Sequence, residues 1–336
     1  MVDISDRCIV AALMMDSERR LVCGFTAARA SDKPTTMFTL AHLTDPHLGP
    51  LPEMRRRELA SKRLFGYVNW QRNRSRRFDD QVVAALVDDI HAHQPDHVVV
   101  TGDLVNLALR EEFVAAHDWL TRLGPPDRVT VIPGNHDAYV PGATQQFTEI
   151  WRDFMIGDDD SQFVRFPFVR RRGPVAIIGL SSAVATAPLM ATGRIGADQA
   201  AVLGEHLAAL AGEGCFRIVL IHHPPVAGAT AWTKRLIGAG LFRAEIARHG
   251  AELVLHGHNH RTDVARLTGN GGDVPVVGAA AASTAPRADH PGGSYNLFLI
   301  DGADGIFTCK MAERGLRRIG DRVEKLSEQV LTGAAR

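Results

Sequence analysis

The sequence predicts an α/β fold in which buried strands alternate with helices and lie parallel in a sheet. Up to about residue 260, short apolar runs recur along the chain, as in strands that are buried on both faces. The segments between them carry apolar residues at helical spacing, which is typical of βαβ units. Beyond residue 260, strand-like runs follow one another with Gly, Asn and Asp turns. This change predicts an antiparallel second sheet beside the first.

The individual elements follow from these patterns. Six buried strands are predicted, at 38–43, 97–100, 129–132, 175–180, 218–221 and 253–255. Five helices are predicted between them, at 78–91, 111–123, 144–154, 198–210 and 241–249. Asp198 is expected to cap the start of its helix, and Gly124 and Gly250 to end theirs. The prediction is completed by later strands and a charged surface helix, at 264–267, 274–277, 295–300, 306–310 and 321–331.

The length of 336 residues, with 45% hydrophobic and 23% charged residues, fits one large domain with an extension at each end. Residues 1–36 are interpreted as an N-terminal extension outside the core, because Met37 directly precedes the first clear strand. The apolar stretch at 9–15 is short and is followed by charged residues, so it makes a poor signal peptide. The domain is expected to span 37–315, and 316–336 to form a C-terminal surface helix and tail.

Charge and cysteine usage narrow the class of protein. The formal net charge is zero, so no global field favours nucleic acid or an anionic surface. The four cysteines lie far apart and form no CxxC pair, which indicates a reducing compartment and argues against a thiolate metal site. No apolar run is long enough to predict a transmembrane helix. A cytoplasmic protein is expected, with peripheral membrane contact as an open alternative.

Five short motifs, each directly after a predicted strand, carry candidate metal ligands. They are Asp45-Pro46-His47, Gly102-Asp103, Gly134-Asn135-His136-Asp137, His222-His223-Pro224 and Gly257-His258-Asn259-His260. The carboxyl ends of parallel strands converge on one crevice, so residues distant in sequence meet there. Carboxylate, imidazole and amide ligands without sulfur suit zinc, manganese, iron or cobalt. Two neighbouring cations repel unless an anion bridges them, and Asp103 is the best candidate for that bridge.

A lone DxH or Gly-Asp pair is a weak signal, since Gly-Asp commonly marks a turn, whereas GNHD or GHNH after a strand is moderately specific. The signal comes from all five in order, each at the end of a strand. Gly102, Gly134 and Gly257 are expected to let the chain turn sharply and to bring ligand backbone close to the ions.

With these motifs the sequence resembles the calcineurin-like metallophosphoesterase superfamily, whose pattern is DxH, GD, GNH[DE], H and GHxH. The resemblance covers about residues 38–310. Within the superfamily it is most similar to the bacterial class III cyclic-nucleotide and glycerophosphodiester phosphodiesterases. The similarity lies in the HHPP sequence at 222–225 and LHGHNH at 255–260, and more weakly in Gly193-Arg194-Ile195 with Gln199. The resemblance implies a four-layer sandwich of two mixed β-sheets flanked by helices.

The resemblance also implies a role for each motif residue. Two divalent metal ions (Mn, Fe, Zn or Co) would be held by Asp45, His47 and His260, by Asn135, His222 and His258, and by Asp103 as the bridge. His136 would face the substrate, with Asp137 orienting its ring and raising its basicity. The implied reaction is hydrolysis of a small phosphodiester by a metal-bridging hydroxide, with His136 assisting the leaving group.

Other polar residues near the motifs receive plainer interpretations. His223 and His256 adjoin ligands but point the other way by strand alternation, which favours a supporting or packing role. His42 is interpreted as a strand residue. Asn106 is expected either to support the site or to contact phosphate, and Arg194 is a candidate phosphate clamp.

Residues 50–77 form a basic and aromatic insertion between the first two motifs. The insertion has nine Lys or Arg against two Glu, together with Phe65, Tyr67 and Trp70. The favoured interpretation is a solvated, partly helical insertion over the rim of the site. Contact with an anionic lipid or membrane surface, or with a nucleic-acid backbone, is the alternative. No specific nucleic-acid partner is expected, and the oligomeric state is not predicted.

The leading function is therefore a binuclear metal-dependent phosphodiesterase. One alternative is a lipid-processing pyrophosphatase or phosphodiesterase, of the type that cleaves UDP-linked lipid A precursors, which the insertion motivates. Another is a non-catalytic scaffold that keeps the metallophosphoesterase fold for binding partners. A scaffold should have lost ligands or the substrate-facing histidine, whereas this chain retains all of them.

Overall fold

The computed structural model describes residues 37–332, except 56–57, 59–60, 75–76, 160–161 and 288–290. The described residues belong to one compact unit. The predicted extension over 1–36 and the last residues of the predicted tail, 333–336, lie outside the described residues.

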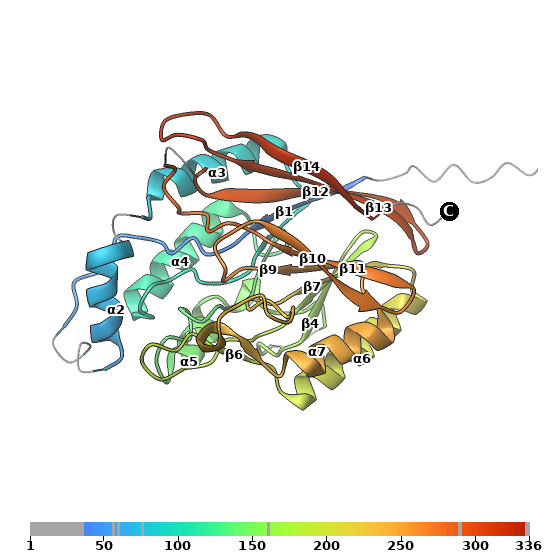
Figure 1. Ribbon diagram of the computed structural model, residues 1–336, viewed down its shortest axis with the longest axis horizontal. Helices are drawn as coiled ribbons and strands as arrows, with labels where there is room; N and C mark the ends of the chain where they lie inside the picture. Colours follow the sequence, from blue (N-terminus) through green and yellow to red (C-terminus); the bar gives the residue numbers. More distant parts are fainter. Residues whose placement is uncertain are drawn as a thin grey trace, which may run out of the picture. The chain divides into compact units, whose positions relative to one another are not determined.

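Two six-stranded mixed sheets form the framework of the described residues (Figure 1). The first sheet consists of β1 (Phe38–Leu43), β2 (His97–Val100), β3 (Val129–Val131), β12 (Ser294–Ala303), β13 (Ile306–Gly315) and β14 (Glu324–Thr332). The second consists of β4 (Phe168–Arg172), β5 (Val175–Gly179), β7 (Phe216–Leu220), β9 (Leu253–His256), β10 (Asp263–Gly269) and β11 (Gly272–Gly278). A small third sheet pairs β6 (Gly193–Arg194) with β8 (Leu236–Ile237). The strand orders are β14-β13-β12-β1-β2-β3 and β10-β11-β9-β7-β5-β4.

Helices cover the outer faces of the two sheets. The helices are α2 (Arg63–Asn69), α3 (Asp80–His93), α4 (Arg110–Leu123), α5 (Ala143–Ile150), α6 (Ala197–Gly212) and α7 (Ala239–His249), with a π-helical turn at Trp70–Arg74 and 3-10 turns at Arg152–Phe154 and Trp232–Lys234. Apolar residues of α3 and α4 are buried with the first sheet, and those of α6 and α7 with the second. No helix of the described chain is long and apolar enough to cross a membrane.

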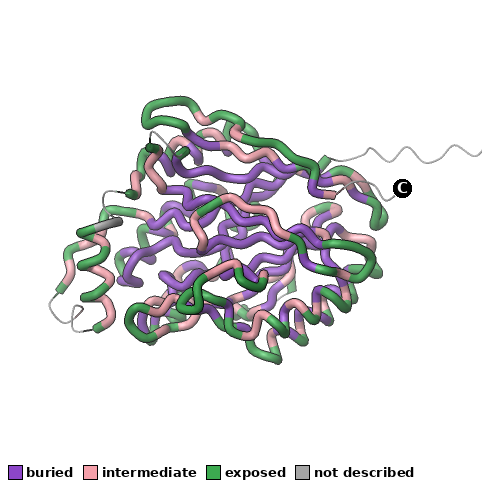
Figure 2. Tube along the Cα trace, viewed as in Figure 1, coloured by how far each residue is buried: buried purple, intermediate pink, exposed green. Residues whose placement is uncertain are grey.

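The two sheets pack face to face, and the alternation of side chains along each strand explains why. In β7, Ile218 and Leu220 belong to the buried cluster shared with the first sheet, whereas Val219 belongs to the cluster shared with α6 and α7. Successive side chains point to opposite faces of the sheet. A strand that is covered on both faces is therefore apolar at most positions. Figure 2 shows the strands buried in the interior. The predicted four-layer sandwich is confirmed.

The parallel strands bring the motifs to one end of the sandwich. β1, β2 and β3 are parallel neighbours in the first sheet, as are β5, β7 and β9 in the second. All five motifs follow the carboxyl ends of these parallel strands. Main-chain hydrogen bonds then tie neighbouring loops together, for example from Asp45 N–H to the Gly102 carbonyl and from Gly257 N–H to the His222 carbonyl.

The prediction of a separate antiparallel sheet after residue 260 is wrong. β12 pairs with β1 and leads into β13, while β10 and β11 extend the second sheet beside β9. The late strands are therefore shared between the two sheets. The physical reason is that β1 and β9 each present an unpaired edge that needs hydrogen-bond partners.

The predicted helix over 321–331 is also wrong, because Glu324–Thr332 forms strand β14. β14 pairs antiparallel with β13, and Leu331 is buried in the core. Most of its side chains are exposed, and charged residues such as Lys325 and Glu328 protect an edge strand from further pairing. The domain therefore extends to at least residue 332 rather than ending at 315.

Two helix boundaries were predicted correctly and one was not. Gly124 and Gly250 end α4 and α7 as expected. Gly196, not Asp198, precedes α6. Asp198 lies in the first turn, where its negative charge still stabilises the helix by interacting with the helix dipole. The predicted helix at 144–154 is divided into α5 and the following 3-10 turn.

Candidate metal centre

The structure brings the seven predicted ligands together in two adjoining groups. Asp45, His47, Asp103 and His260 offer ligand atoms that all lie within 4.8 Å of one another. In the second group, Nε2 of His222 lies 3.2 Å from Oδ1 of Asn135, and the rings of His222 and His258 are 5.2 Å apart. Oδ2 of Asp103 lies 3.9 Å from Nε2 of His47 and 3.5 Å from Nε2 of His222. Asp103 thus occupies the position between the groups that a bridging ligand requires.

The first group contains a buried oxygen whose surroundings fit a cation. Oδ2 of Asp45 accepts hydrogen bonds from Thr44 Oγ1 and from the main-chain N–H of His258. Oδ1 of Asp45 is buried and accepts no hydrogen bond. It lies 3.2 Å from Nε2 of His260, which is 3.3 Å from Nε2 of His47. Two imidazole nitrogens and a carboxylate oxygen around one point match the donor set of a divalent transition metal.

Main-chain carbonyls aim three of the imidazoles at the centre. Nδ1 of His222 donates to the Thr101 carbonyl at 2.6 Å, and Nε2 of His258 donates to the Lys234 carbonyl at 3.0 Å. His47 makes a longer bond from Nδ1 to the carbonyl of Val105, at 3.4 Å. Each bond directs the opposite nitrogen inward, namely Nε2 of His222 and His47 and Nδ1 of His258. Histidine ligands of metals are commonly oriented in this way.

The two carboxylates give the centre a negative charge that a cation would balance. Asp45 and Asp103 are both buried. Burial acts to raise the pKa of Asp45, but the nearby imidazoles, His260 first, hold it well below its usual range. Burial acts to lower the pKa of His222, yet the charge and hydrogen bond of Asp103 outweigh it and raise the pKa to about 9. Both shifts have the same cause, the close approach of carboxylates and imidazoles in the centre.

Five of the seven predicted ligands have an unusual backbone conformation. The φ angles are positive at Asp45 (50°), His47 (40°), Asp103 (56°), His258 (69°) and His260 (54°). Such a conformation costs a non-glycine residue about 1 kcal/mol or more and persists where the surrounding structure imposes it. Strained residues of this kind cluster at functional sites. Of the nine non-glycine residues with positive φ in the described chain, five are therefore predicted ligands.

The motif glycines allow the loops to approach closely, as predicted. Gly102 has φ 95°, and a Cβ there would clash with the backbone of Gly134. A Cβ on Gly134 would in turn clash with the carboxylate of Asp103, and one on Gly257 with the side chain of Thr44.

His136 lies beside the ligands rather than among them. Its main-chain N–H donates to Oδ1 of Asp103 at 2.6 Å, and Nδ1 of its ring donates to the Asn106 carbonyl at 2.7 Å. The ring is edge-on to His47, with centroids 4.9 Å apart, and stacks on Tyr139 at 5.4 Å.

The predicted role of Asp137 is wrong. Its carboxylate accepts hydrogen bonds from four main-chain N–H groups, those of Asp103, Leu104, Val105 and Gly134. The ring of His136 is instead oriented by the Asn106 carbonyl. Burial, followed by the charge of Asp103, raises the pKa of Asp137, and main-chain donors oppose that rise. Asp137 is therefore a positioning residue for the loop that carries Asp103.

Two charged residues that the sequence analysis missed hold the rest of this loop. Glu112 of α4 is buried, and its carboxylate accepts the N–H groups of residues 106, 107 and 109. Arg63 of α2 donates to the carbonyls of Leu107 and Ala108. A glutamate at the third position of a helix is a known N-terminal signal, so Glu112 was detectable. Arg63 had no comparable signal.

Asn106 supports the site. Its side-chain Nδ2 donates to the carbonyls of His47 and Leu48, at 3.3 and 3.0 Å. Its main-chain carbonyl holds the ring of His136. The amide thus joins the loop after β1 to the loop after β2, and its donors are used by the protein itself.

The neighbouring histidines also have supporting contacts. His223 offers a nitrogen within 4.8 Å of ligand atoms of His222 and His258. However, its Nδ1 bonds to Ser182 Oγ and its Nε2 to the Ala191 carbonyl, which occupies both nitrogens. Burial lowers its pKa well below the usual value, so the ring is neutral.

His42 and His256 are buried in strands. His42 bonds through Nε2 to Thr101 Oγ1, and Nδ1 of His256 bonds to the Gly257 carbonyl. His42 is a strand residue, as predicted.

The insertion contacts the rim of the centre. Nζ of Lys62 donates to Thr186 Oγ1 at 2.7 Å and to the Met190 carbonyl at 3.2 Å. The same Nζ lies 4.4 Å from the centroid of Tyr139, the ring that stacks on His136. The insertion is therefore connected to His136 through one aromatic residue. The side chain of Arg194 is exposed on β6.

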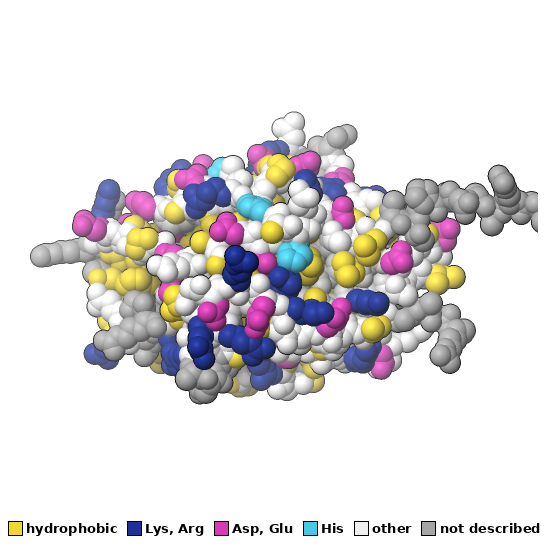
Figure 3. Space-filling model, turned by 90° about the horizontal axis from the view of Figure 1, so that it is seen from above, with side chains coloured by type: hydrophobic (Ala, Val, Ile, Leu, Met, Phe, Trp, Pro, Cys, Tyr) yellow, Lys and Arg dark blue, Asp and Glu magenta, His cyan; other side chains and the backbone are white. Residues whose placement is uncertain are grey.

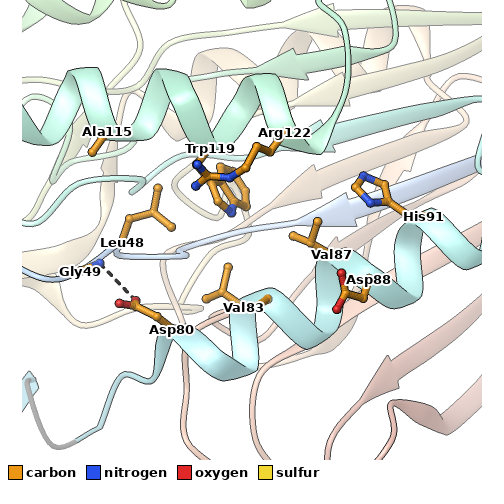
Figure 4. Close-up of a pocket in the computed structure, with 11 residues that line it drawn as sticks. Leu48, Gly49, Asp80, Val83, Val87, Asp88, His91, Ala115, Trp119 and Arg122 are labelled. Carbon is orange, nitrogen blue, oxygen red and sulfur yellow. Dashed lines mark hydrogen bonds between the residues drawn. The ribbon is translucent and has the colours of Figure 1, made fainter.

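A separate cavity of about 460 Å³ lies between α3 and α4 (Figure 4). Val83 and Trp119 line it from the two helices, and Leu48 and Gly49 from the loop after β1. Asp80 accepts the N–H of Gly49 at its edge. None of the predicted ligands lines this cavity, so it is distinct from the metal centre.

The fold and the ligand set define a metallophosphoesterase. The family model of calcineurin-like phosphoesterases matches residues 38–262, and the chain belongs to this family. No curated protein matched the sequence.

One solved structure supports the fold, and two others have lower similarity. A purple acid phosphatase from yellow lupin (Lupinus luteus) seeds superposes with a TM-score of 0.59 at 11% identity, over 88% of this chain and 54% of that one. This chain thus spans about half the length of the lupin enzyme. A dimetal phosphatase from Danio rerio has a TM-score of 0.49 at 14% identity, over 86% of this chain and 99% of that one. The NAD nucleotidase of Haemophilus influenzae has a TM-score of 0.49 at 12% identity, over 87% and 60%.

Proposed function

We propose that this protein is a binuclear metal-dependent phosphodiesterase that hydrolyses a small phosphodiester. The observation that carries the proposal is the convergence of Asp45 Oδ1, His47 Nε2 and His260 Nε2 on one point. Oδ2 of Asp103 faces both this point and the second group. The donor set fits Mn, Fe, Zn or Co.

Each group of ligands has an assigned ion. Asp45, His47 and His260 would hold the first ion, Asn135, His222 and His258 would hold the second, and Asp103 would be a ligand of both. When bound, two dications lower the pKa of a water molecule and offset the charge of the phosphoryl oxygens.

His136 is assigned to the leaving group. The Asn106 carbonyl engages Nδ1 and so fixes the ring, and the proton given to the departing alkoxide is assigned to Nε2. The main-chain hydrogen bond from His136 to Asp103 holds the proposed general acid, His136, next to the proposed bridging ligand. General acid catalysis of this kind contributes about 10²–10⁴-fold to the rate.

The choice of a diester rests on the similarity of residues 222–225 and 255–260 to the phosphodiesterase branch of the family. An assay of the manganese-loaded protein tests it with bis(p-nitrophenyl) phosphate, cyclic AMP and p-nitrophenyl phosphate. Turnover of a diester with a higher kcat/KM than that of the monoester is expected. Turnover of the monoester alone would contradict the diester assignment, and no turnover of any substrate would contradict the enzyme itself.

A second candidate function keeps the chemistry and changes the substrate to a lipid-linked pyrophosphate or phosphodiester. It is favoured by the apolar side chains that α2 exposes beside the rim, at Leu64, Phe65 and Val68. A UDP-linked lipid added to the same assay distinguishes the two candidates. Preferential cleavage of the lipid over the soluble diesters would support the second.

A further inference from the structure

The polarity of α2 is the reverse of that of an ordinary surface helix. Its apolar residues Leu64, Phe65 and Val68 are 45%, 56% and 37% exposed. The cations at its start, Lys62 and Arg63, are half-buried and donate to protein oxygens. A surface helix normally buries its apolar face and solvates its charges. The outward face of α2 is therefore suited to an apolar contact.

Basic residues precede and follow α2 along the chain. Residues 50–77 contain nine Lys or Arg against two Glu, in a chain whose net charge is zero. Arg55, Arg72 and Arg77 are exposed on either side of α2. Basic and acidic side chains are intermixed over much of the face shown in Figure 3. Positive charge is therefore concentrated in the insertion.

We propose that α2 and its flanking arginines dock the protein on an anionic membrane surface, with Leu64, Phe65 and Val68 entering the interface. Apolar side chains bordered by Lys and Arg are the combination that binds such surfaces reversibly. Each flanking arginine contributes near the membrane surface and is screened by salt.

A second copy of the chain is a less suitable occupant for this face. In a twofold contact the same patch meets itself, so the arginines of one copy would face those of the other. Nucleic acid is less suitable for a different reason. Of the three exposed apolar side chains only Phe65 could stack on a base, whereas Leu64 and Val68 could not.

The contacts of α2 give the docking a defined orientation. Arg63 holds the loop after β2 through the carbonyls of Leu107 and Ala108, and Lys62 contacts the 186–190 segment. Figure 1 shows α2 at the end of the sandwich, near α4. A membrane bound by α2 would therefore lie beside the rim of the metal centre.

Vesicle co-sedimentation of the full chain tests the proposal. The vesicles contain phosphatidylcholine with about 30% phosphatidylglycerol, or phosphatidylcholine alone, at low and high salt. The test variant combines Leu64→Ser, Phe65→Ser and Val68→Ser. The matched control combines Ile306→Ser, Ile319→Ser and Val330→Ser, which removes exposed apolar residues elsewhere.

The wild type and the control should pellet with anionic vesicles at low salt, and binding should fall at high salt. The test variant should bind at least about tenfold more weakly. Failure of the wild type to bind, unchanged binding of the test variant, or equal loss in both variants would each overturn the proposal. Binding of a single-stranded oligonucleotide but not of vesicles, or a dimer that only the test variant loses, would assign the face to another partner.

A second measurement keeps the proposal testable if the test variant does not fold. Trp70 follows α2 directly. Brominated lipids in anionic vesicles should quench part of the tryptophan fluorescence of the wild type, and Trp70→Phe should remove that part. Equal quenching of the wild type and Trp70→Phe would contradict docking through α2. Both experiments measure binding alone, so their outcome does not depend on phosphodiesterase activity.

Discussion

The main-chain N–H of His136 donates a 2.6 Å hydrogen bond to Oδ1 of Asp103, while Oδ2 of the same carboxylate faces His47 and His222. One carboxylate thus joins the ligand groups to the proposed acid. The two residues nevertheless have different roles, because only Asp103 presents a ligand atom to both groups.

Substitution of these two residues should separate metal binding from catalysis. His136→Ala should retain both metal ions and lose about 10²–10⁴-fold in kcat, because it removes only the proton donor. Asp103→Ala should lose metal, because it removes the ligand placed between the two groups. Metal analysis after gel filtration, together with kcat on a diester, measures both effects. Equal metal loss in the two variants would contradict the division of roles.

Asp137→Asn should destabilise the loop that carries Asp103 and should leave the orientation of the His136 ring unchanged. The asparagine would present N–H groups where four main-chain donors now meet one carboxylate. A loss of about 2 kcal/mol or more in the free energy of unfolding is expected, since buried main-chain N–H groups lose their acceptor. Urea unfolding and metal affinity should both decline. A variant with normal stability and metal affinity but a shifted pH–rate profile would instead support the role first predicted for Asp137, that of orienting the His136 ring.

A methyl group at Gly134 should damage the metal centre. A Cβ there would lie 2.7 Å from Cε1 of His222 and would also clash with the Asp103 carboxylate. Gly134→Ala should therefore bind metal at least about tenfold more weakly, because sub-ångström ligand shifts matter in such sites. Gly240→Ala in α7 is the control, since a Cβ there meets nothing within 4 Å. Isothermal titration with Mn²⁺ compares the two, and equal affinities would show that the loop can adjust.

His97 should make stability depend on pH on the acid side. Burial, then the charges of Arg172 and Arg170, lower its pKa from 6.5 to about 3. Above pH 6.5 the histidine is neutral in both the folded and the unfolded protein, and folding has no protonation cost. Between pH 6.5 and pH 3 only the unfolded protein binds the proton, so the free energy of unfolding falls as the pH drops. The loss is about 1.4 kcal/mol per pH unit for one group.

His97→Gln is the test of this pH dependence. Glutamine stays neutral and can still bond to Thr130, the partner of His97 Nε2. Between pH 7 and pH 5 the wild type should lose about 2 kcal/mol more stability than the variant. The difference between the two proteins removes the contribution of the other histidines. Parallel stability curves would show that the pKa of His97 is the same in the folded and unfolded states, which would contradict the prediction.

Much of the architecture was predictable because the spacing of apolar residues along the chain indicates which faces of a strand or helix are buried. The runs that became β1, β2 and β9 are mostly apolar, since each strand is covered on both faces. The partners of the strands were not predictable in the same way. The alternation along β10 to β13 shows that they are strands, but it does not say which edge they will join.

The sequence by itself determined the elements that carry the proposed ligands, and it predicted which residues those are, from Asp45 to His260. This is because a ligand at a strand end depends on its own residue type and on a local turn. Only the tertiary structure decided what Asp137 binds, that Glu112 and Arg63 hold the loop after β2, and that 324–332 forms a strand. It also decided that α2 turns its cations inward. Those outcomes depend on hydrogen bonds and contacts between distant segments, and no local pattern in the chain encodes them.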